Sequence, residues 1–505
     1  MHRIASLGWL FAAFLILPGS VQAAQGKPQL SSTSTTCQAC HASVHPGIVE
    51  GWKKSLHSRS SPAMGMAKPE LERRISARNV PEDLREVSVG CAECHTLNPE
   101  SHADTFNHNG FQVHTVVTPE DCAVCHPQER EQFTRNIMSQ ARGNLIDNPV
   151  FSDLQQSIIG PPTLEQAGLR FGEPDRLTTE EACLYCHGTK IEVQGQEQRK
   201  TVMGPMTFPV LKGWPNQGVG RLNPDGSLGS CSACHTRHDF SIVTARKPYT
   251  CKECHIGPDV PAYKVYSTSK HGNIFSTHES SWDFEAVPWK VGQDFTAPTC
   301  AACHMSLTVT PQGKVVAQRT HQVNNRLATR LFGLIYAHAH PKDPDTTKIR
   351  NSQGLPLPTD FQNRPASEFL ISKEEQAARR TTMQAICTQC HGGSWTANHF
   401  ERLDNTIATT NQATLTGTTM MLEAWDLGLA SGLAQGQSLF DEGIEKLWSR
   451  TWLIDANTVR FASAMAGGGD YGVFANGRYE LATHLAEMRD WIELRKGLEA
   501  QPASD

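Results

Sequence analysis

The sequence predicts a mainly α-helical fold, with a large region of short helices and loops followed by a bundle of longer helices near the C-terminus. Three observations predict it. A short cysteine motif recurs eight times between residues 37 and 391. Loops rich in glycine and proline separate the motifs, and the chain has 39 glycines and 29 prolines. After residue 396, apolar residues recur at the steps of three and four that mark one face of a helix.

The repeated motif is Cys-x-x-Cys-His, and its eight copies use all 16 cysteines of the chain. Cys-x-x-Cys-His attaches c-type haem: the thiols add to the vinyl groups, and the histidine binds the iron. Neither disulfides nor zinc sites explain why a histidine follows every second cysteine. The sequence therefore predicts a multihaem cytochrome c with eight covalently bound haems. The motifs are Cys37/Cys40/His41, Cys91/Cys94/His95, Cys122/Cys125/His126, Cys183/Cys186/His187, Cys231/Cys234/His235, Cys251/Cys254/His255, Cys300/Cys303/His304 and Cys387/Cys390/His391.

The motifs are densest between Cys231 and His271, where the fifth and sixth copies lie close together with His238 between them. So few intervening residues cannot separate two porphyrins. We therefore expect the fifth and sixth haems to touch.

The N-terminal residues 1–24 have the pattern of a secretory signal peptide. Arg3 is followed by an apolar run over residues 7–17, then by Pro18 and a small-x-small cleavage site that ends at Ala23. The run is short for a membrane span, although an uncleaved anchor is the alternative. We expect a soluble mature protein in the periplasm or an equivalent compartment, where c-type haem is attached.

Composition favours one haem-filled core over several independent domains. Only 38% of the residues are hydrophobic, which is low for so long a chain, and eight porphyrins would supply the missing apolar volume. We expect this octahaem core to span residues 25–395. The formal charge is −5 and haem propionates add to it, so a basic cytochrome is a plausible electron acceptor and nucleic acid is not a ligand.

Within the core, strand patterns are few and brief, for example at residues 314–317. Residues 213–230 form a turn-rich loop after the fourth motif, with a turn predicted at Asn223-Pro-Asp-Gly. Residues 339–360 are also predicted to be irregular.

Residues 396–505 predict a helical region without haem. Asn398 and Glu401 resemble a helix N-cap and its capping partner. A second helix is expected over residues 440–461, a glycine loop over 467–472, and a third helix through Leu481 and Ile492. The region is either a cap on the core or an oligomerisation bundle. Four tryptophans favour the bundle: Trp425, Trp448, Trp452 and Trp491.

Histidines outside the motifs are the candidates for the second axial ligand of each iron. The chain has 22 histidines; eight belong to motifs and His2 to the signal peptide, which leaves thirteen. Eight would serve a pure electron carrier and seven an enzyme with one open iron, so the count allows both. His238 is too close to His235 to bind the same iron. The predicted distal ligands are His57, His114, His238, His271, His321 and His399; His484 is expected at the surface.

The eight motifs, the sequence CHTRHDFS between the paired sites and the following YSTSKHG resemble the octahaem hydroxylamine oxidoreductase family. PTCAACHMS, THQVNNR and the helical tail extend the likeness over nearly the whole mature chain. Other octahaem families place lysine at the catalytic haem or stretch one cysteine spacing, and this chain does neither.

This resemblance implies a homotrimer whose fourth haem, held by Cys183, Cys186 and His187, is five-coordinate and catalytic. In the family, a tyrosine of a neighbouring subunit is bonded to that haem. Here the matching residue is Tyr471 in GGGDYG, with Tyr479 as the competitor. The acid–base candidates are Asp225, Asp239 and His238, the last of which cannot also bind iron.

The implied reaction is oxidation of hydroxylamine or hydrazine, with electrons passing through seven further haems to a cytochrome. The alternatives are a reductive member of the family, which converts nitrite or hydroxylamine to ammonia, and a non-enzymatic electron conduit with eight six-coordinate irons.

Overall fold

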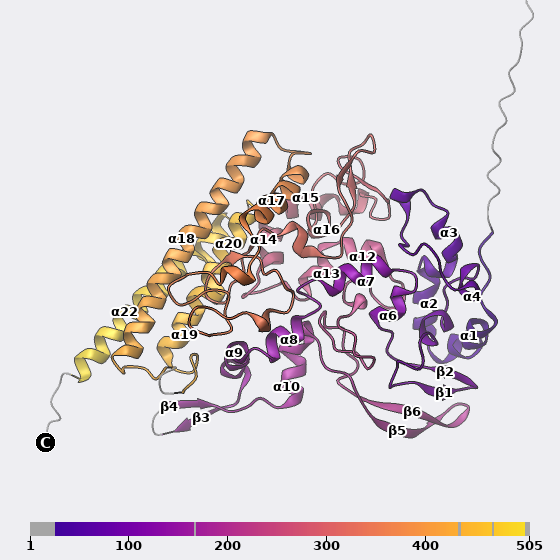
Figure 1. Cartoon of the computed structure of the whole chain (residues 1–505), viewed down its shortest axis with the longest axis horizontal. Coiled ribbons are helices and arrows are strands. Elements are labelled where there is room, and N and C mark those ends of the chain that lie inside the picture. The colour runs from indigo at the N-terminus through magenta and orange to yellow at the C-terminus, as the bar shows by residue number, and fades with distance from the viewer. Residues whose placement is uncertain (1–25, 166–167, 433–435, 467–468, 500–505) are drawn as a thin grey trace, which may run out of the picture.

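The computed structural model describes residues 26–165, 168–432, 436–466 and 469–499. The predicted signal peptide lies outside these residues. Along the longest axis of the molecule, the N-terminal helices occupy one end and the long C-terminal helices the other (Figure 1). None of the described helices is both long and apolar enough to cross a bilayer.

The region of the eight motifs consists of short helices, as the sequence predicts. Proline occupies the first turn of six of them, where its missing N–H costs nothing and its fixed φ suits the helix. The helices are α1 (Ser32–Val44), α2 (Pro46–Lys54), α3 (Pro62–Met66), α4 (Glu82–Arg85), α5 (Ala92–His95), α6 (Pro119–Ala123), α7 (Pro127–Thr134), α8 (Ala141–Ile146), α9 (Pro149–Ile159), α10 (Arg176–Glu181), α11 (Cys183–His187), α12 (Ile242–Arg246), α13 (Pro248–Lys252), α14 (Ala262–Thr268), α15 (Lys270–His278), α16 (Cys300–His304) and α17 (Lys373–Cys387).

The strands form small separate sheets, none with more than three strands among the described residues. The prediction at residues 314–317 is confirmed by β9. The pairs are β1 (Phe106–His108) with β2 (Phe111–Val113), β3 (Pro162–Glu165) with β4 (Gly168–Phe171), β5 (Glu192–Thr201) with β6 (Gly204–Lys212) and β10 (Thr329–Arg330) with β11 (His338–Ala339); β7 (Trp289–Lys290), β8 (Thr308–Val309) and β9 (Val315–Ala317) form the three-stranded sheet.

The hairpin β5–β6 contradicts the expectation that all strands are brief. Its strands have ten and nine residues and pair from Glu192↔Lys212 to Thr201↔Gly204. The segment carries Gly195 and two prolines and few apolar residues, so its composition hides the strands. Figure 1 shows the hairpin along one edge of the molecule.

The C-terminal region contains three long helical segments, in the predicted order. They are α18 (Gly393–Asp426), a continuous helix made of α19 (Gly443–Arg450), a π-helical turn (Thr451–Asp455) and α20 (Ala456–Ala464), and finally α22 (Arg478–Glu499).

Two details of the predicted tail are wrong. The N-cap of α18 is Gly392, not Asn398, because the helix starts almost directly after the eighth motif. The predicted glycine loop is in part a short helix, α21 (Gly469–Phe474), which contains Tyr471; Gly467 and Gly468 lie outside the described residues.

The tail shares one hydrophobic core with the haem region. Tyr336 and Phe361 of the haem region pack in the same cluster as Trp448 and Trp452, which are fully buried. Trp425 and Trp491 pack against that cluster. The four tryptophans therefore fill the inside of the subunit, so they no longer support an oligomerisation surface. The predicted boundary at residue 395 falls in the first turn of α18.

His484 is buried rather than exposed, which corrects the prediction. Its ring is 8% exposed and lies 2.7 Å from the carboxylate of Asp455 in the π-helical turn. Burial raises the pKa of Asp455 to about 6, against the opposing effect of His484. This pair joins α22 to the helix before it.

Candidate functional site

Each Cys-x-x-Cys-His motif closes one helical turn. The backbone N–H of the motif histidine donates to the carbonyl of the first cysteine, for example at 2.9 Å from His95 to Cys91 and 2.8 Å from His126 to Cys122. Residues at i, i+3 and i+4 of such a turn share a face. Both thiols and the imidazole can therefore reach one group. All 16 cysteines lie among the described residues, and none forms a disulfide.

Six of the motifs, the third to the eighth, line one continuous cavity of about 2110 Å³, and Cys94 of the second motif also reaches it. An ordinary ligand pocket holds roughly 300–1,000 Å³. This space is about twice the upper end of that range and is bounded by thiols and imidazoles, as several closely packed haems require.

Five motif histidines face a second imidazole across a gap of nearly constant width. Two imidazoles on opposite sides of one iron, each bonded at about 2 Å, have ring centres roughly 6 Å apart. The pairs with this separation are His41–His108 at 6.0 Å, His95–His238 at 6.5 Å, His95–His114 at 6.0 Å, His126–His57 at 6.3 Å, His235–His321 at 6.4 Å and His391–His271 at 6.1 Å.

These rings are in the chemical state that a metal needs. Burial lowers the pKa of His57 and of His321 to about 4, so both are neutral at neutral pH and keep a free lone pair. His108, which the sequence reasoning missed, lies on β1 beside Phe106 and Phe208. Only its place opposite His41 identifies it, and no local pattern would have done so.

Two more histidines, His340 and His399, line the cavity. His340 lies 3.1 Å through Nδ1 from the carbonyl of Pro341, which leaves its Nε2 free. Among the described residues, no imidazole faces His187, His255 or His304 at about 6 Å. His338 also has a buried Nε2 without a hydrogen-bond partner but does not line the cavity, so two spare histidines that line it remain for three motifs.

The predicted loop over residues 213–230 packs against the fourth motif. Val219 donates its N–H to the carbonyl of Cys186 at 2.9 Å. A side chain at Gly220 would lie 2.7 Å from the carbonyl oxygen of His187, so the loop backbone fits directly against the motif. The turn at Asn223 is also confirmed: Gly226 donates to the Asn223 carbonyl at 2.9 Å, with φ at +83°.

Charged side chains flank His187. Its Nδ1 donates to the carbonyl of Ala141 at 2.9 Å, which leaves Nε2 for a metal. Burial lowers the pKa of His187, while the Ala141 carbonyl and the carboxylate of Asp259 oppose this, and the charge of Arg330 adds to it. Asp259 and Arg330 both line the cavity.

The three predicted acid–base residues lie elsewhere. Asp225 accepts hydrogen bonds from Thr118 at 2.7 Å and from Ser227 at 2.6 Å. Asp239 accepts one from Thr236 at 2.8 Å within its own turn. His238 faces His95. None of the three lines the cavity beside the fourth motif, whereas Asp259, which sequence reasoning missed, does.

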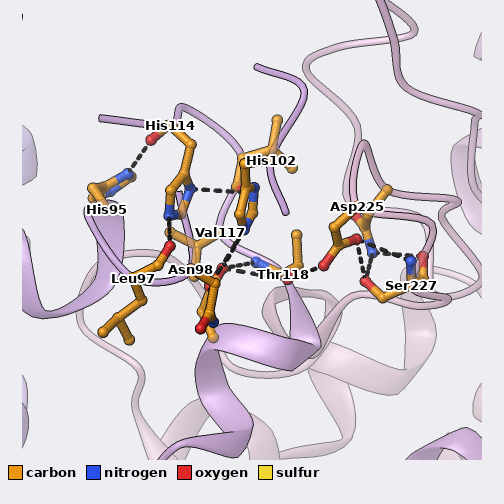
Figure 2. Close-up of polar contacts among 12 residues, drawn as sticks. His95, Leu97, Asn98, His102, His114, Val117, Thr118, Asp225 and Ser227 are labelled. Carbon is orange, nitrogen blue, oxygen red and sulfur yellow. Dashed lines mark hydrogen bonds and ion pairs between the residues drawn. The ribbon is translucent and has the colours of Figure 1, made fainter. Parts of the chain in front are cut away.

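His114, a predicted distal ligand, lies 6.0 Å from His95, but both of its ring nitrogens face backbone carbonyls rather than the other imidazole. Its Nε2 lies 3.0 Å from the carbonyl of Leu97 and its Nδ1 lies 3.2 Å from that of Val116. Its ring stacks on His102 at 3.7 Å (Figure 2). Its own carbonyl accepts the Nδ1–H of His95 at 2.9 Å, so His114 orients that ligand through its backbone.

His102 forms the centre of a buried charge network (Figure 2). Its two ring nitrogens lie 3.3 Å from the carboxylates of Asp104 and Asp121. Desolvation opposes the charge on His102, but the hydrogen bonds to these carboxylates outweigh it and raise the pKa to about 9. His102, His114 and Asp121 have the composition of a metal site, with ligand atoms within 4.8 Å. Their nitrogens are already paired with oxygen atoms.

The network predicts a loss of stability in alkali. Because the pKa of His102 rises from an unfolded value of 6.5 to about 9, its contribution is complete below pH 6.5 and is lost as pH rises through 9. The loss amounts to about 3 kcal/mol. The thermal midpoint of the wild type should fall between pH 7 and pH 10, and that of His102→Gln should start lower and fall less. Parallel curves for the two proteins would contradict the assignment.

The two candidate tyrosines lie near each other in the tail. Tyr471 on α21 is partly buried, which raises its pKa, and Tyr479 on α22 is 59% exposed. Neither lines the cavity of its own subunit. Phe474, 57% exposed, lies 6.1 Å from Tyr479.

Comparison with known proteins gives a consistent result. A family model described as seven times multi-haem cytochrome CxxCH matches residues 226–328, and one described as cytochrome c554 and c-prime matches residues 36–120. A solved structure described as a hypothetical multiheme protein is 42% identical, with a TM-score of 0.88 over 94% of this chain and 98% of that chain.

Two proteins of Kuenenia stuttgartiensis are more distant. A probable nitrite reductase–hydroxylamine oxidoreductase fusion protein is 26% identical over 287 residues, 53% of this chain. The match spans only 25% of that relative's length. The reducing HAO-like protein complex contains a chain that shares the fold, with a TM-score of 0.61 and 19% identity over 92% of this chain and 86% of that one.

Proposed function

Because the chain belongs to the multihaem c-type cytochromes, we propose that it is an octahaem oxidoreductase that converts a small nitrogen compound at the haem of the fourth motif. One assignment carries the proposal: five motif histidines face a second imidazole, and two further histidines that line the cavity are available to two of the remaining three. One iron is thereby left with an open coordination position, which an enzyme needs and an electron carrier does not.

The proposed partners follow from the ring separations. The five facing pairs other than His95–His114 are assigned to the first, second, third, fifth and eighth haems. His340 and His399, which line the cavity, are assigned to the two haems held by His255 and His304. His187 then has no partner. The backbone of the 213–230 loop and the side chains of Asp259 and Arg330 surround this motif, which suits a site of reaction.

A haem at this position would supply an iron that binds nitrogen ligands and exchanges electrons. The protein's own part is to hold the ligand and manage protons. Cys183 and Cys186 would carry the group, and Ala141 fixes the ring of His187 through Nδ1. The carboxylate of Asp259 is the group on this wall that can accept or return a proton, as each oxidation or reduction of a nitrogen–hydrogen bond requires.

For the direction of the reaction, oxidation of hydroxylamine or hydrazine is the first candidate. It rests on Tyr471, a tyrosine that could reach the fourth haem of a neighbouring subunit. The second candidate is reduction of nitrite or hydroxylamine to ammonia. The names of the two Kuenenia stuttgartiensis relatives favour it, since one is a probable nitrite reductase fusion and the other a reducing complex.

The remaining haems would carry electrons between the fourth motif and a cytochrome partner. Cys40, Cys254 and Cys390, in the first, sixth and eighth motifs, are exposed, so haems at these three motifs would approach the surface. We further propose that residues 1–24 direct the protein to the periplasm, where haem attachment takes place.

A spectroscopic experiment tests the open position directly. Electron paramagnetic resonance of the oxidised holoprotein should show a single haem that responds to cyanide or nitric oxide while seven signals stay unchanged. The His187 haem is expected to respond because the proposed assignment of distal histidines leaves only this iron without a second imidazole. If all eight signals resist both ligands, the protein is an electron conduit instead.

A trimer is also proposed, and sedimentation of the full chain tests it. Exposed apolar side chains remain on the tail, including Val473, Phe474 and Leu494, although the tryptophans are internal. The holoprotein at micromolar concentration should sediment as three subunits, and a monomer would contradict the proposal. Truncation at residue 393 is not a clean test, because it would uncover the core shared by Tyr336, Phe361 and Trp448.

A further inference from the structure

Arg330 occupies an unusual position on the cavity wall. It lies on β10, which pairs with β11 so that Arg330 is directly opposite His338. Directly opposed residues of an antiparallel pair share a face, and so does the residue two positions along, His340. Arg330 and His340 both line the large cavity.

The guanidinium of Arg330 has no polar partner among the described residues. It lies 5.6 Å from the ring centre of Phe332, and neither a hydrogen bond nor an ion pair holds it. Burial lowers its pKa to about 10. Its charge in turn lowers the pKa of His187, His338 and His340, so its neighbours are imidazoles rather than carboxylates.

Two buried arginines of this chain, Arg460 and Arg326, are well paired. Arg460 donates to Asn411 at 2.7 Å and to Thr410 at 3.2 Å. Arg326 donates to the carbonyls of Cys303 and Ser306, each at 3.0 Å, and so stabilises the loop of the seventh motif. Unlike these two, the half-buried Arg330 is an unpaired cation, and an unpaired charge away from bulk water is strongly unfavourable.

From this we infer that Arg330 binds a carboxylate of the haem attached at Cys183 and Cys186. The inference rests on the proposed haem of the fourth motif. The planar fork of arginine matches a carboxylate through two parallel hydrogen bonds. Nitrite offers similar oxygen atoms, but a substrate that comes and goes would leave the cation unpaired in the resting protein. A carboxylate that is part of the bound cofactor pairs with it permanently.

The consequence is electrostatic. A fixed positive charge close to His187 stabilises the added electron when this iron is reduced, and so raises its midpoint potential. Arg330 is thus a positioning residue: it holds one side of the haem and tunes its potential through a carboxylate, without touching the substrate.

Potentiometric titration of the holoprotein tests the inference. In Arg330→Gln, the haem that responds to nitric oxide should have a lower midpoint potential than in the wild type, with the other seven unchanged. Arg330→Lys keeps the charge but loses the fork, so the same potential should fall by a smaller amount. If Arg330→Gln cannot be obtained as a folded holoprotein, the potential measured in Arg330→Lys decides the test. The matched control is Arg350→Gln, which removes an exposed arginine that does not line the cavity and should leave all eight potentials in place.

Two results would overturn the inference. Wild-type potentials in both Arg330 variants would show that no haem carboxylate is bound there. If the potentials stay but nitrite binding to the oxidised protein weakens roughly 10- to 100-fold, with hydroxylamine binding unchanged, the anion is free nitrite. If the proposed function itself is wrong, the result is distinguishable from these two: no haem of the wild-type protein would respond to nitric oxide.

Discussion

Asp259→Asn is expected to lower the turnover number by about 100- to 10,000-fold while the haem content of the protein stays unchanged. An amide occupies nearly the same volume as the carboxylate but cannot accept a proton. The backbone carbonyl of Asp259, which accepts a hydrogen bond from Asn457 at 3.1 Å, is untouched, so the loop should keep its place. Turnover with hydroxylamine and an electron acceptor, and with nitrite and a reductant, measures the effect in both directions.

The control for this variant is Asp343→Asn. Asp343 pairs with Lys348 at the surface, 3.0 Å away, and does not line the cavity, so the same chemical change should leave turnover within a factor of two or so. Asp259→Glu should retain part of the activity, since it keeps a carboxylate in a slightly shifted place. Full activity in Asp259→Asn would show that Asp259 takes no part in the mechanism. Water would then be the candidate proton acceptor.

The sequence was sufficient for the haem chemistry because a covalent motif is local. Two cysteines and a histidine within five residues define a haem site wherever the chain goes. The helices of the tail could also be predicted, since apolar residues recur at steps of three and four over residues 443–464 and again in α22. The long hairpin β5–β6 was not, because β5 is almost wholly polar and β6 contains two prolines, which are disfavoured in strands.

Ligand pairing depends on contacts between distant segments, and this limits what a sequence shows. His108 faces His41 in the structure, although the two are 67 positions apart in the chain. No sequence pattern near either residue indicates the other. His114 is the opposite case. The sequence made it a candidate distal ligand, yet both its ring nitrogens face backbone carbonyls and its ring stacks on His102.

The acid–base residues show the same limit. Asp225 and Asp239 were plausible because they lie near motifs in the sequence, but both carboxylates satisfy local turns. Asp259 follows the sixth motif, and folding brings it close to the histidine of the fourth. Which carboxylate lies near which motif depends on how the motifs pack together in space. No short sequence pattern encodes that packing.

If, as proposed, Tyr471 is bonded to the fourth haem of a neighbouring subunit, denaturing electrophoresis of the wild type should show subunits that stay joined after boiling with reductant. Tyr471 does not line the cavity of its own subunit, so another copy must supply the contact. The helix that carries it is short and closely packed: a side chain at Gly472 would lie 2.8 Å from the Cβ of Ala462. Val473 and Phe474, 37% and 57% exposed, provide an apolar surface for the neighbour beside it.

Tyr471→Phe should abolish both the crosslink and hydroxylamine oxidation, since a ring without its hydroxyl cannot form the bond that alters the porphyrin and biases it toward oxidation. Tyr479→Phe is the matched control, because Tyr479 is the competing residue on the same surface and its loss should leave the crosslink intact. Loss of the crosslink in Tyr479→Phe alone would reassign the bond. A wild type that runs only as monomer and yields an unmodified Tyr471 peptide would remove the main support for oxidation. Reduction of nitrite or hydroxylamine to ammonia would then be the better account of an open iron flanked by Asp259 and Arg330.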